Sequence, residues 1–194
     1  MCGIVGYIGD KNATDILLEG LSKLEYRGYD SAGIAVIKDG NIQVEKHKGR
    51  LSVLEESLKD KDMVGNLGIG HTRWATHGEP SDVNSHPHLN NDHSIAVVHN
   101  GIIENYLVLR EELMEKGYEF ISETDTEVIP CLIDYYYDGD LEEAVKKAVS
   151  RLEGAYALGI IHKDHPDMLI AVRKDSPLVV GVGEGENFIA SDIP

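Results

Sequence analysis

Cysteine, basic side chains and long apolar runs are all scarce in this chain of 194 residues. Cys2 and Cys131 are its two cysteines, which excludes a disulfide framework, and Cys131 lies in an apolar stretch typical of an inert core thiol. Lys and Arg total 18 against 34 Asp and Glu, a net charge of −16, which argues against nucleic acid and anionic membranes as partners. No apolar run approaches the roughly 18 residues of a membrane span, and no signal peptide is recognisable. We therefore expect a cytoplasmic protein.

The bulk composition is that of a globular domain. Hydrophobic residues make up 42% and charged residues 27% of the chain, as in ordinary soluble domains. The sequence contains no internal repeat, no low-complexity segment and no linker that would divide it. We expect residues 1–194 to form one domain.

Apolar patterns predict groups of strands and groups of helices rather than a strict β-α-β succession. Six short runs are expected to be strands buried on both faces: residues 4–8, 34–37, 95–98, 155–161, 168–172 and 178–180. Asp39-Gly40 predicts a tight hairpin into a strand over residues 42–44, so part of the sheet is antiparallel. The expected fold class is α+β, with two stacked sheets and helices outside.

Five helices are predicted from apolar periodicity and from residues that cap or end helices. Asn12 and Asp140 are the expected N-caps of the first and the fifth, and Pro130 fits the first turn of the fourth. The third is expected to stop at Gly117 and to bury one face: Ile103, Tyr106, Leu107, Leu113 and Met114.

Cys2 is the first candidate catalytic residue. Removal of Met1 would make Cys2 the N-terminal residue, so that one residue carries both a thiol and an α-amino group. The amine titrates at about 8 and the thiol at about 8.5, which suits the amine as a general base for the thiol near neutral pH. A small residue after Met1 also occurs by chance, so position 2 alone is weak evidence.

Polar, glycine-rich segments interrupt the apolar pattern at predicted strand ends. In residues 27–33, Arg27 and Asp30 are suited to pair, although a purely structural loop explains the segment equally well. Residues 71–80 follow a buried strand and contain Arg73, whose planar fork suits a carboxylate. A surface ion pair is an equally good interpretation of Arg73. The single tryptophan, Trp74, lies in the same loop.

Two further segments supply hydrogen-bond donors and an acid. Asn100-Gly101 follows an apolar strand and precedes a predicted helix, so the Asn amide and the Gly N–H are candidates for the two donors of an oxyanion hole. A hairpin turn is the alternative. Asp125, in the acidic segment 122–127, either caps the next helix or binds an ammonium group. With Arg73 for a carboxylate and Cys2 as nucleophile, the expected ligand is an amino acid with a reactive amide, such as glutamine.

These motifs resemble class II glutamine amidotransferases over nearly the whole chain. The resemblance rests on residues 2–6, 27–33, 71–80, 100–101 and 124–127. Residues 27–33, residues 71–80 and the segment His86-Pro87-His88 narrow the resemblance to the branch that aminates fructose 6-phosphate. It implies the four-layer αββα sandwich of N-terminal-nucleophile hydrolases, with no cofactor and no metal.

The resemblance also implies roles for the candidate residues. Cys2 would attack the glutamine side-chain amide, release ammonia and form a γ-glutamyl thioester. Asn100 and Gly101 would stabilise the oxyanion, Arg73 would bind the glutamine carboxylate, and Asp125 would bind its amino group. Thr76 and His77 would line the glutamine pocket, and Trp74 would gate the passage of ammonia. Arg27 and His86 would support the site.

Members of that branch continue into two sugar-isomerase domains, which bind fructose 6-phosphate, and the full-length enzyme is expected to be a homodimer. This chain ends at Pro194. The resemblance therefore predicts a glutaminase domain shortened at its C-terminal end, without the isomerase domains.

Three alternatives remain open. Six of the nine histidines fall between His71 and His99, which permits a metal site, although cysteine ligands and a helical His-x-x-x-His pair are missing. A glutamine sensor would bind the ligand through Arg73 and Asp125 without turnover. Glycines at 181, 183 and 185 permit a phosphate loop, but without Gly-Lys-Ser/Thr they are better interpreted as a turn between strands.

Overall fold

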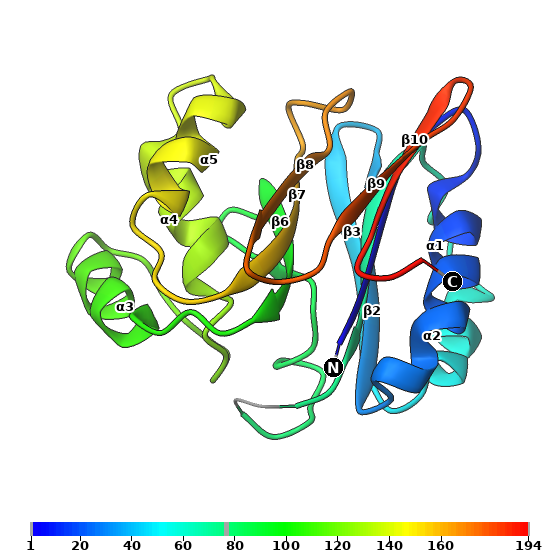
Figure 1. Ribbon diagram of the computed structural model, residues 1–194, viewed down its shortest axis with the longest axis horizontal. Helices are drawn as coiled ribbons and strands as arrows, with labels where there is room; N and C mark the ends of the chain where they lie inside the picture. Colours follow the sequence, from blue (N-terminus) through cyan, green and yellow to red (C-terminus); the bar gives the residue numbers. More distant parts are fainter. Residues whose placement is uncertain (1, 76–77, 194) are drawn as a thin grey trace.

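The computed structural model describes residues 2–75 and 78–193 as two antiparallel sheets stacked face to face (Figure 1). Helices cover the outer face of each sheet, so the molecule has four layers in the order α, β, β, α. The predicted αββα sandwich is confirmed.

The larger sheet has six strands in the order β3-β2-β4-β1-β10-β9. Its strands are β1 (Gly3–Gly9), β2 (Ser31–Lys38), β3 (Asn41–Lys48), β4 (Leu67–Arg73), β9 (Val179–Val182) and β10 (Glu186–Ala190). The predicted hairpin between β2 and β3 is confirmed: Asp39 and Gly40 have φ values of 50° and 74°, as a tight primed turn requires. Gly183 and Gly185 belong to the turn between β9 and β10, as expected, whereas Gly181 lies within β9 and pairs with Phe188.

The smaller sheet has the order β5-β6-β7-β8. Its strands are β5 (His88–Leu89), β6 (Ile95–Gly101), β7 (Tyr156–His162) and β8 (Ile170–Lys174). The central strands β6 and β7 are buried almost throughout, which explains their nearly continuous apolar sequences.

The helices pack in two groups. On the larger sheet lie α1 (Ala13–Leu24), the short 3-10 helix η1 (Glu25–Arg27) and α2 (Leu51–Leu58); on the smaller sheet lie α3 (Tyr106–Glu115), α4 (Val128–Tyr136) and α5 (Leu141–Val149). The predicted N-caps are confirmed, since Asn12 accepts the N–H of Thr14 and Asp140 accepts that of Glu143. Pro130 lies in the first turn of α4, where its missing N–H leaves no helical partner unsatisfied.

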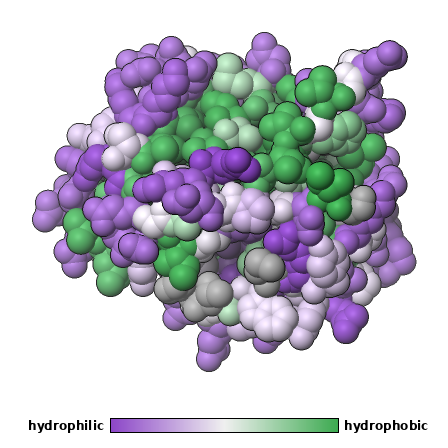
Figure 2. Space-filling model, viewed as in Figure 1, coloured by the Kyte–Doolittle hydropathy of each residue, from purple (hydrophilic) through white to green (hydrophobic). Residues whose placement is uncertain are grey.

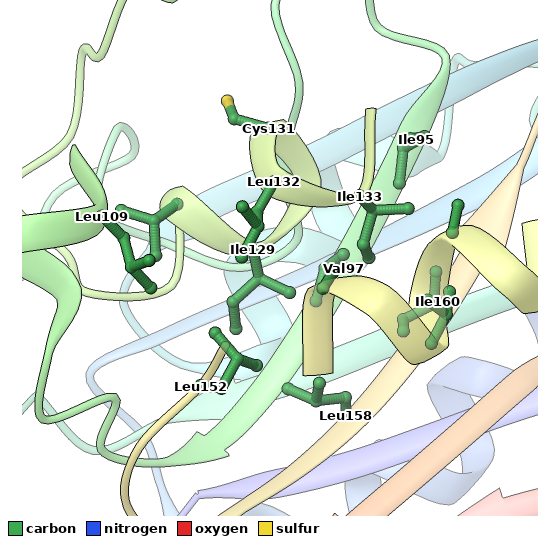
Figure 3. Close-up of a cluster of buried hydrophobic side chains, with 14 of the residues drawn as sticks. Ile95, Val97, Leu109, Ile129, Cys131, Leu132, Ile133, Leu152, Leu158 and Ile160 are labelled. Carbon is green, nitrogen blue, oxygen red and sulfur yellow. The ribbon is translucent and has the colours of Figure 1, made fainter. Parts of the chain in front are cut away.

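A separate apolar core fills each interface between layers. Ile4, Ile69 and Val98 lie between the two sheets. Figure 3 shows the core between the smaller sheet and its helices, where Ile129 of α4 packs toward Val97 of β6. Cys131 belongs to this core, and burial raises the pKa of its thiol to about 12, so it is inert as expected.

Two predictions about burial need correction. Ile103 and Leu113 are buried as predicted, but Leu107 and Met114 are more than half exposed. Leu109 is buried in their place, because the face of α3 that joins the core is that of Leu109 and Leu113. Strands β8 and β9 are not buried on both faces: each lies at the edge of its sheet, and their outward side chains are exposed. Figure 2 shows the resulting apolar surface over these two strands.

No helix in the described part of the chain combines the length and apolar character needed to cross a membrane.

Candidate active site

The strand register and the stacking of the sheets bring three sequence segments to one end of the sandwich. Gly3 at the start of β1 pairs with Thr72 near the end of β4, which places Cys2 beside Arg73. β6 of the other sheet ends at Asn100 and Gly101, and Asn100 Nδ2 lies 3.0 Å from the carbonyl oxygen of Cys2. Residues separated by almost one hundred positions in sequence are therefore in direct contact.

A cavity of about 440 Å³ opens at this end, a volume suited to a small ligand. Eight of the ten predicted site residues line it: Cys2, Arg27, Arg73, Trp74, His86, Asn100, Gly101 and Asp125. The remaining two, Thr76 and His77, lie outside the described residues.

The thiol of Cys2 is held by the backbone of Trp74. The N–H of Trp74 donates to Cys2 Sγ over 3.1 Å, and the Trp74 carbonyl oxygen lies 3.5 Å from the same sulfur. Burial raises the pKa of the thiol, while the Trp74 N–H and the positive charge of Arg73 oppose that rise. The surroundings therefore favour the neutral thiol.

Arg73 forms part of the cavity wall. It is 3% exposed, which contradicts the alternative of a surface ion pair. Its Nη2 donates to the carbonyl oxygen of Gly78 over 3.3 Å. Burial lowers the pKa of the guanidinium, and the nearby Cys2, Asp30 and Asp125 oppose this effect. A buried guanidinium at a cavity is suited to bind a carboxylate through paired hydrogen bonds.

Asn100 and Gly101 end β6 without forming a two-residue hairpin, since the chain continues toward α3. The Asn100 amide has a partner at each end: Oδ1 accepts from His71 Nε2 at 3.0 Å, and Nδ2 donates to Cys2. An amide nitrogen carries two hydrogens, so Nδ2 retains a second donor. Gly101 has a φ of 114°, and a Cβ there would lie 2.1 Å from the carbonyl oxygen of Ala155, which explains the glycine.

Asp125 is buried at the cavity, and its Oδ2 accepts the backbone N–H of Ile103 at 2.8 Å. The N-cap residue of α4 is Glu127, so the alternative that Asp125 caps this helix is wrong. The neighbouring hydroxyls bind buried histidines: Thr124 Oγ1 contacts His88. Thr124, Asp125 and Thr126 all line the cavity.

Thr126 joins two of these histidines, because its Oγ1 lies 2.9 Å from His86 Nε2 and 2.8 Å from His99 Nδ1. Burial lowers the pKa of His71 to about 3 and that of His86 well below its usual value, so both rings are neutral at physiological pH. Within residues 2–75 and 78–193, no group of three or more His, Cys, Asp or Glu side chains is arranged to hold a metal ion. The histidines bind hydroxyl, amide and carbonyl groups instead.

Arg27 and Trp74 both line the cavity, and each has contacts outside it. Arg27 forms an ion pair with Asp192 at 3.1 Å and donates to the carbonyl oxygen of Ser191, while Asp30 accepts the N–H of Ala75. The predicted pairing of Arg27 with Asp30 is therefore replaced by a contact with the C-terminal segment. The Trp74 ring is half exposed and meets the Tyr29 ring edge-on at 5.5 Å between centroids.

Sequence reasoning missed one wall of the cavity. Asp175, Ser176 and Pro177 line it from the connection between β8 and β9. Asp175 has a φ of 55°, as turn residues often do. The segment has the composition of an ordinary turn, and its position beside Cys2 depends on how the two sheets stack.

A cysteine at the start of a central strand, facing donors from the second sheet of an αββα sandwich, defines the class of N-terminal-nucleophile hydrolases. Residues 71–194 match the family model described as glutamine amidotransferase domain. The chain therefore belongs to the glutamine amidotransferase domain family.

Curated relatives and solved structures agree with this assignment. The chain is 71% identical to glutamine–fructose-6-phosphate aminotransferase (isomerizing) of Clostridium perfringens and 57% identical to that of Thermus thermophilus, over all 194 residues in both cases. It spans about a third of the length of these relatives, 32% of each. Glutamine phosphoribosylpyrophosphate amidotransferase of B. subtilis is similar in structure, with a TM-score of 0.84, 29% identity, and coverage of 98% of this chain and 42% of that one.

Proposed function

We propose that this domain hydrolyses the side-chain amide of glutamine at Cys2. The observation that carries the proposal is that one cavity gathers a thiol, two candidate oxyanion donors, a guanidinium and a carboxylate. Arg73 binds the α-carboxylate of glutamine and Asp125 binds its α-ammonium group. The side chain of the ligand then extends toward Cys2, with Asn100 beside it.

The reaction begins when the α-amino group of Cys2, freed by removal of Met1, takes the thiol proton. Sγ attacks the amide carbon, and the carbonyl electrons move to an oxyanion stabilised by Asn100 Nδ2 and the N–H of Gly101. The carbon–nitrogen bond then breaks, and the nitrogen leaves as ammonia with the proton held by the amine. Water attacks the resulting γ-glutamyl thioester, which releases glutamate and restores the thiol.

The surroundings of the thiol support this sequence of steps. Burial raises the pKa of Cys2, so the free thiolate is disfavoured until a base takes the proton. The α-amine lies on the same residue and titrates at about 8, close to the working pH.

The remaining predicted residues are given supporting roles. Thr76 and His77 line the glutamine pocket, and the half-exposed Trp74 gates the passage of ammonia. Arg27 fixes the C-terminal segment through Asp192, and His86 supports the site from beneath. These roles rest on the positions of Trp74, Arg27 and His86 at the cavity and on the family resemblance.

The full-length protein is proposed to use the ammonia to aminate fructose 6-phosphate, acting as a homodimer in the cytoplasm. The curated relatives named for that reaction are 55–71% identical to the chain, whereas the phosphoribosylpyrophosphate enzyme is 29% identical. Both cysteines are free, in keeping with a reducing compartment. Formation of glucosamine 6-phosphate from glutamine and fructose 6-phosphate by the full-length protein tests this assignment.

The glutaminase proposal is tested by replacing the nucleophile. We expect Cys2→Ala to lower glutamine hydrolysis at least about a thousand-fold, because the covalent route is lost, while calorimetry shows glutamine still bound. Cys131→Ala, which alters the core cysteine, is expected to keep kcat. Hydrolysis by Cys2→Ala within ten-fold of the wild type would contradict the proposal. Binding of glutamine by the wild type without release of glutamate would support the sensor alternative instead.

A further inference from the structure

His71 joins the two sheets directly behind the candidate oxyanion hole. It lies on β4 of the larger sheet and is 1% exposed. Its side chain reaches β6 of the smaller sheet, where Nε2 lies 3.0 Å from the carbonyl oxygen of His99 and 3.0 Å from Asn100 Oδ1. The proposed reaction gives this histidine no direct role.

The partners of His71 fix where its proton lies. A backbone carbonyl oxygen can only accept a hydrogen bond, so Nε2 must carry the hydrogen that it shares with His99. The Asn100 atom facing that hydrogen must then be the oxygen of the amide. The nitrogen of the amide is left on the opposite side, where it lies 3.0 Å from the carbonyl oxygen of Cys2.

The reverse orientation of the Asn100 amide is disfavoured at both ends. A half-turn would bring Nδ2 against the N–H of His71, so that two donors face each other. The same half-turn would bring Oδ1 against the carbonyl oxygen of Cys2 and present an oxygen, rather than a donor, beside the thiol. An oxyanion developing there would be repelled.

We propose that His71 is a positioning residue, whose Nε2–H locks the Asn100 side chain with its nitrogen toward Cys2. This inference rests on the proposed function, in which that nitrogen stabilises the oxyanion. The His71 ring is held by stacking on His86, with 4.1 Å between ring centroids and 21° between planes. Its Nδ1 has no hydrogen-bond partner among the described residues, which suits a neutral ring with one proton on Nε2.

The first test compares His71→Phe with His71→Gln. Phe fills the space without a donor, whereas the Gln amide places a donor near the former Nε2. We expect His71→Phe to lower kcat for glutamine hydrolysis about 100-fold, the usual effect of losing one oxyanion donor, with KM within about threefold of the wild type. In His71→Phe, the rate at which iodoacetamide alkylates Cys2 should stay within threefold of the wild-type rate. The kcat of His71→Gln should be at least tenfold higher than that of His71→Phe.

Matched variants separate the possible failures. His162 is another buried strand histidine, at the end of β7 that lies away from Gly101. His162→Phe is therefore expected to keep the wild-type kcat. If Asn100→Ala leaves kcat unchanged, the proposed oxyanion role itself fails. If Asn100→Ala lowers kcat but a folded His71→Phe does not, only the present inference is overturned. In the Asn100→Ala background, His71→Phe should have little further effect, because the two residues act as one unit.

A measurement on the wild type covers the case in which His71→Phe does not fold. Two-bond nitrogen–proton NMR spectra of histidine-labelled protein report the tautomer of each ring. We expect His71 to carry its proton on Nε2 at pH 7 and to remain neutral down to pH 5. A neutral ring with its proton on Nδ1 would overturn the proposal.

Discussion

At the scale of single residues, the thiol of Cys2 lies in surroundings that disfavour its ionised form. Burial raises its pKa, and the Trp74 N–H and Arg73 only partly offset this. A cysteine that formed a thiolate without help would react with any electrophile that entered the cavity. In the proposed mechanism, activation by its own α-amine would tie reactivity to a mature N-terminus and to a correctly bound ligand.

Asp125 offers the sharpest test of ligand binding at one position. We expect Asp125→Asn to raise KM for glutamine at least about tenfold, because a hydrogen bond to a charged group contributes about 1.5–3 kcal/mol. The value of kcat and the unfolding midpoint should change little, since the Asn oxygen can still accept the N–H of Ile103. Steady-state kinetics and urea unfolding measure the two effects.

The matched control for Asp125→Asn changes the ligand instead of the protein. Glutaramate is glutamine without its α-amino group. The wild type should bind glutaramate as weakly as Asp125→Asn binds glutamine, and the variant should lose no further affinity for glutaramate. An equal loss of affinity for glutaramate in both proteins would show that Asp125 does not contact the amino group.

The candidate residues could be predicted from sequence because each lies at one end of an apolar run. Cys2 precedes β1, Arg73 ends β4, and Asn100 lies at the end of β6. Their supports could not be predicted. The bonds from the Thr126 hydroxyl to His86 and His99 span 40 and 27 residues, and no local pattern records which hydroxyl faces which ring.

At the scale of elements, Lys46 of β3 holds the segment that carries His86. Its Nζ donates to the carbonyl oxygens of Ser85 at 2.8 Å and Pro87 at 3.1 Å, on either side of His86. Burial lowers the pKa of Lys46 to about 8. One lysine therefore connects the larger sheet to the floor of the cavity.

The lowered pKa of Lys46 predicts a pH dependence of stability. Between about pH 8 and 10.5 the folded protein releases this proton before the unfolded chain does, so the free energy of unfolding rises with pH in this window. The rise is at most about 1.4 kcal/mol per pH unit for one proton. The wild type should therefore gain stability relative to Lys46→Met from pH 7.5 to 9.5 in urea unfolding.

Lys48→Met, at an exposed position on the same strand, is the matched control for the loss of one positive charge. If the stability of the wild type relative to Lys46→Met stays constant or falls as pH rises, the carbonyl contacts of the ammonium group, rather than burial, dominate the energetics of Lys46.

The elements that sequence reasoning misplaced are those whose burial depends on neighbours. The apolar residues of α3 allow more than one inward face, and packing selects Leu109 and Leu113. The apolar runs of β8 and β9 resemble those of β6 and β7, yet the first two are edge strands and the last two are central. Composition records the preference for a strand but not its place in the sheet.

At the scale of the whole molecule, the site exists only where the two sheets meet. Cys2 and Arg73 come from the larger sheet, and Asn100 and Gly101 come from the smaller one. The layered fold could be predicted because helices and strands cluster separately along the chain. The alignment of the strand ends could not, because it depends on how the sheets pack.

The central claim is that this sandwich makes Cys2 a nucleophile for glutamine, and intact mass tests it most directly. The protein is weighed before and after incubation with a diazoketone analogue of glutamine, and the adduct is mapped. We expect a chain without Met1 that gains one adduct, on Cys2, more slowly when glutamine is in excess. A folded chain without Met1 that stays unmodified, or an adduct on Cys131, would contradict the account.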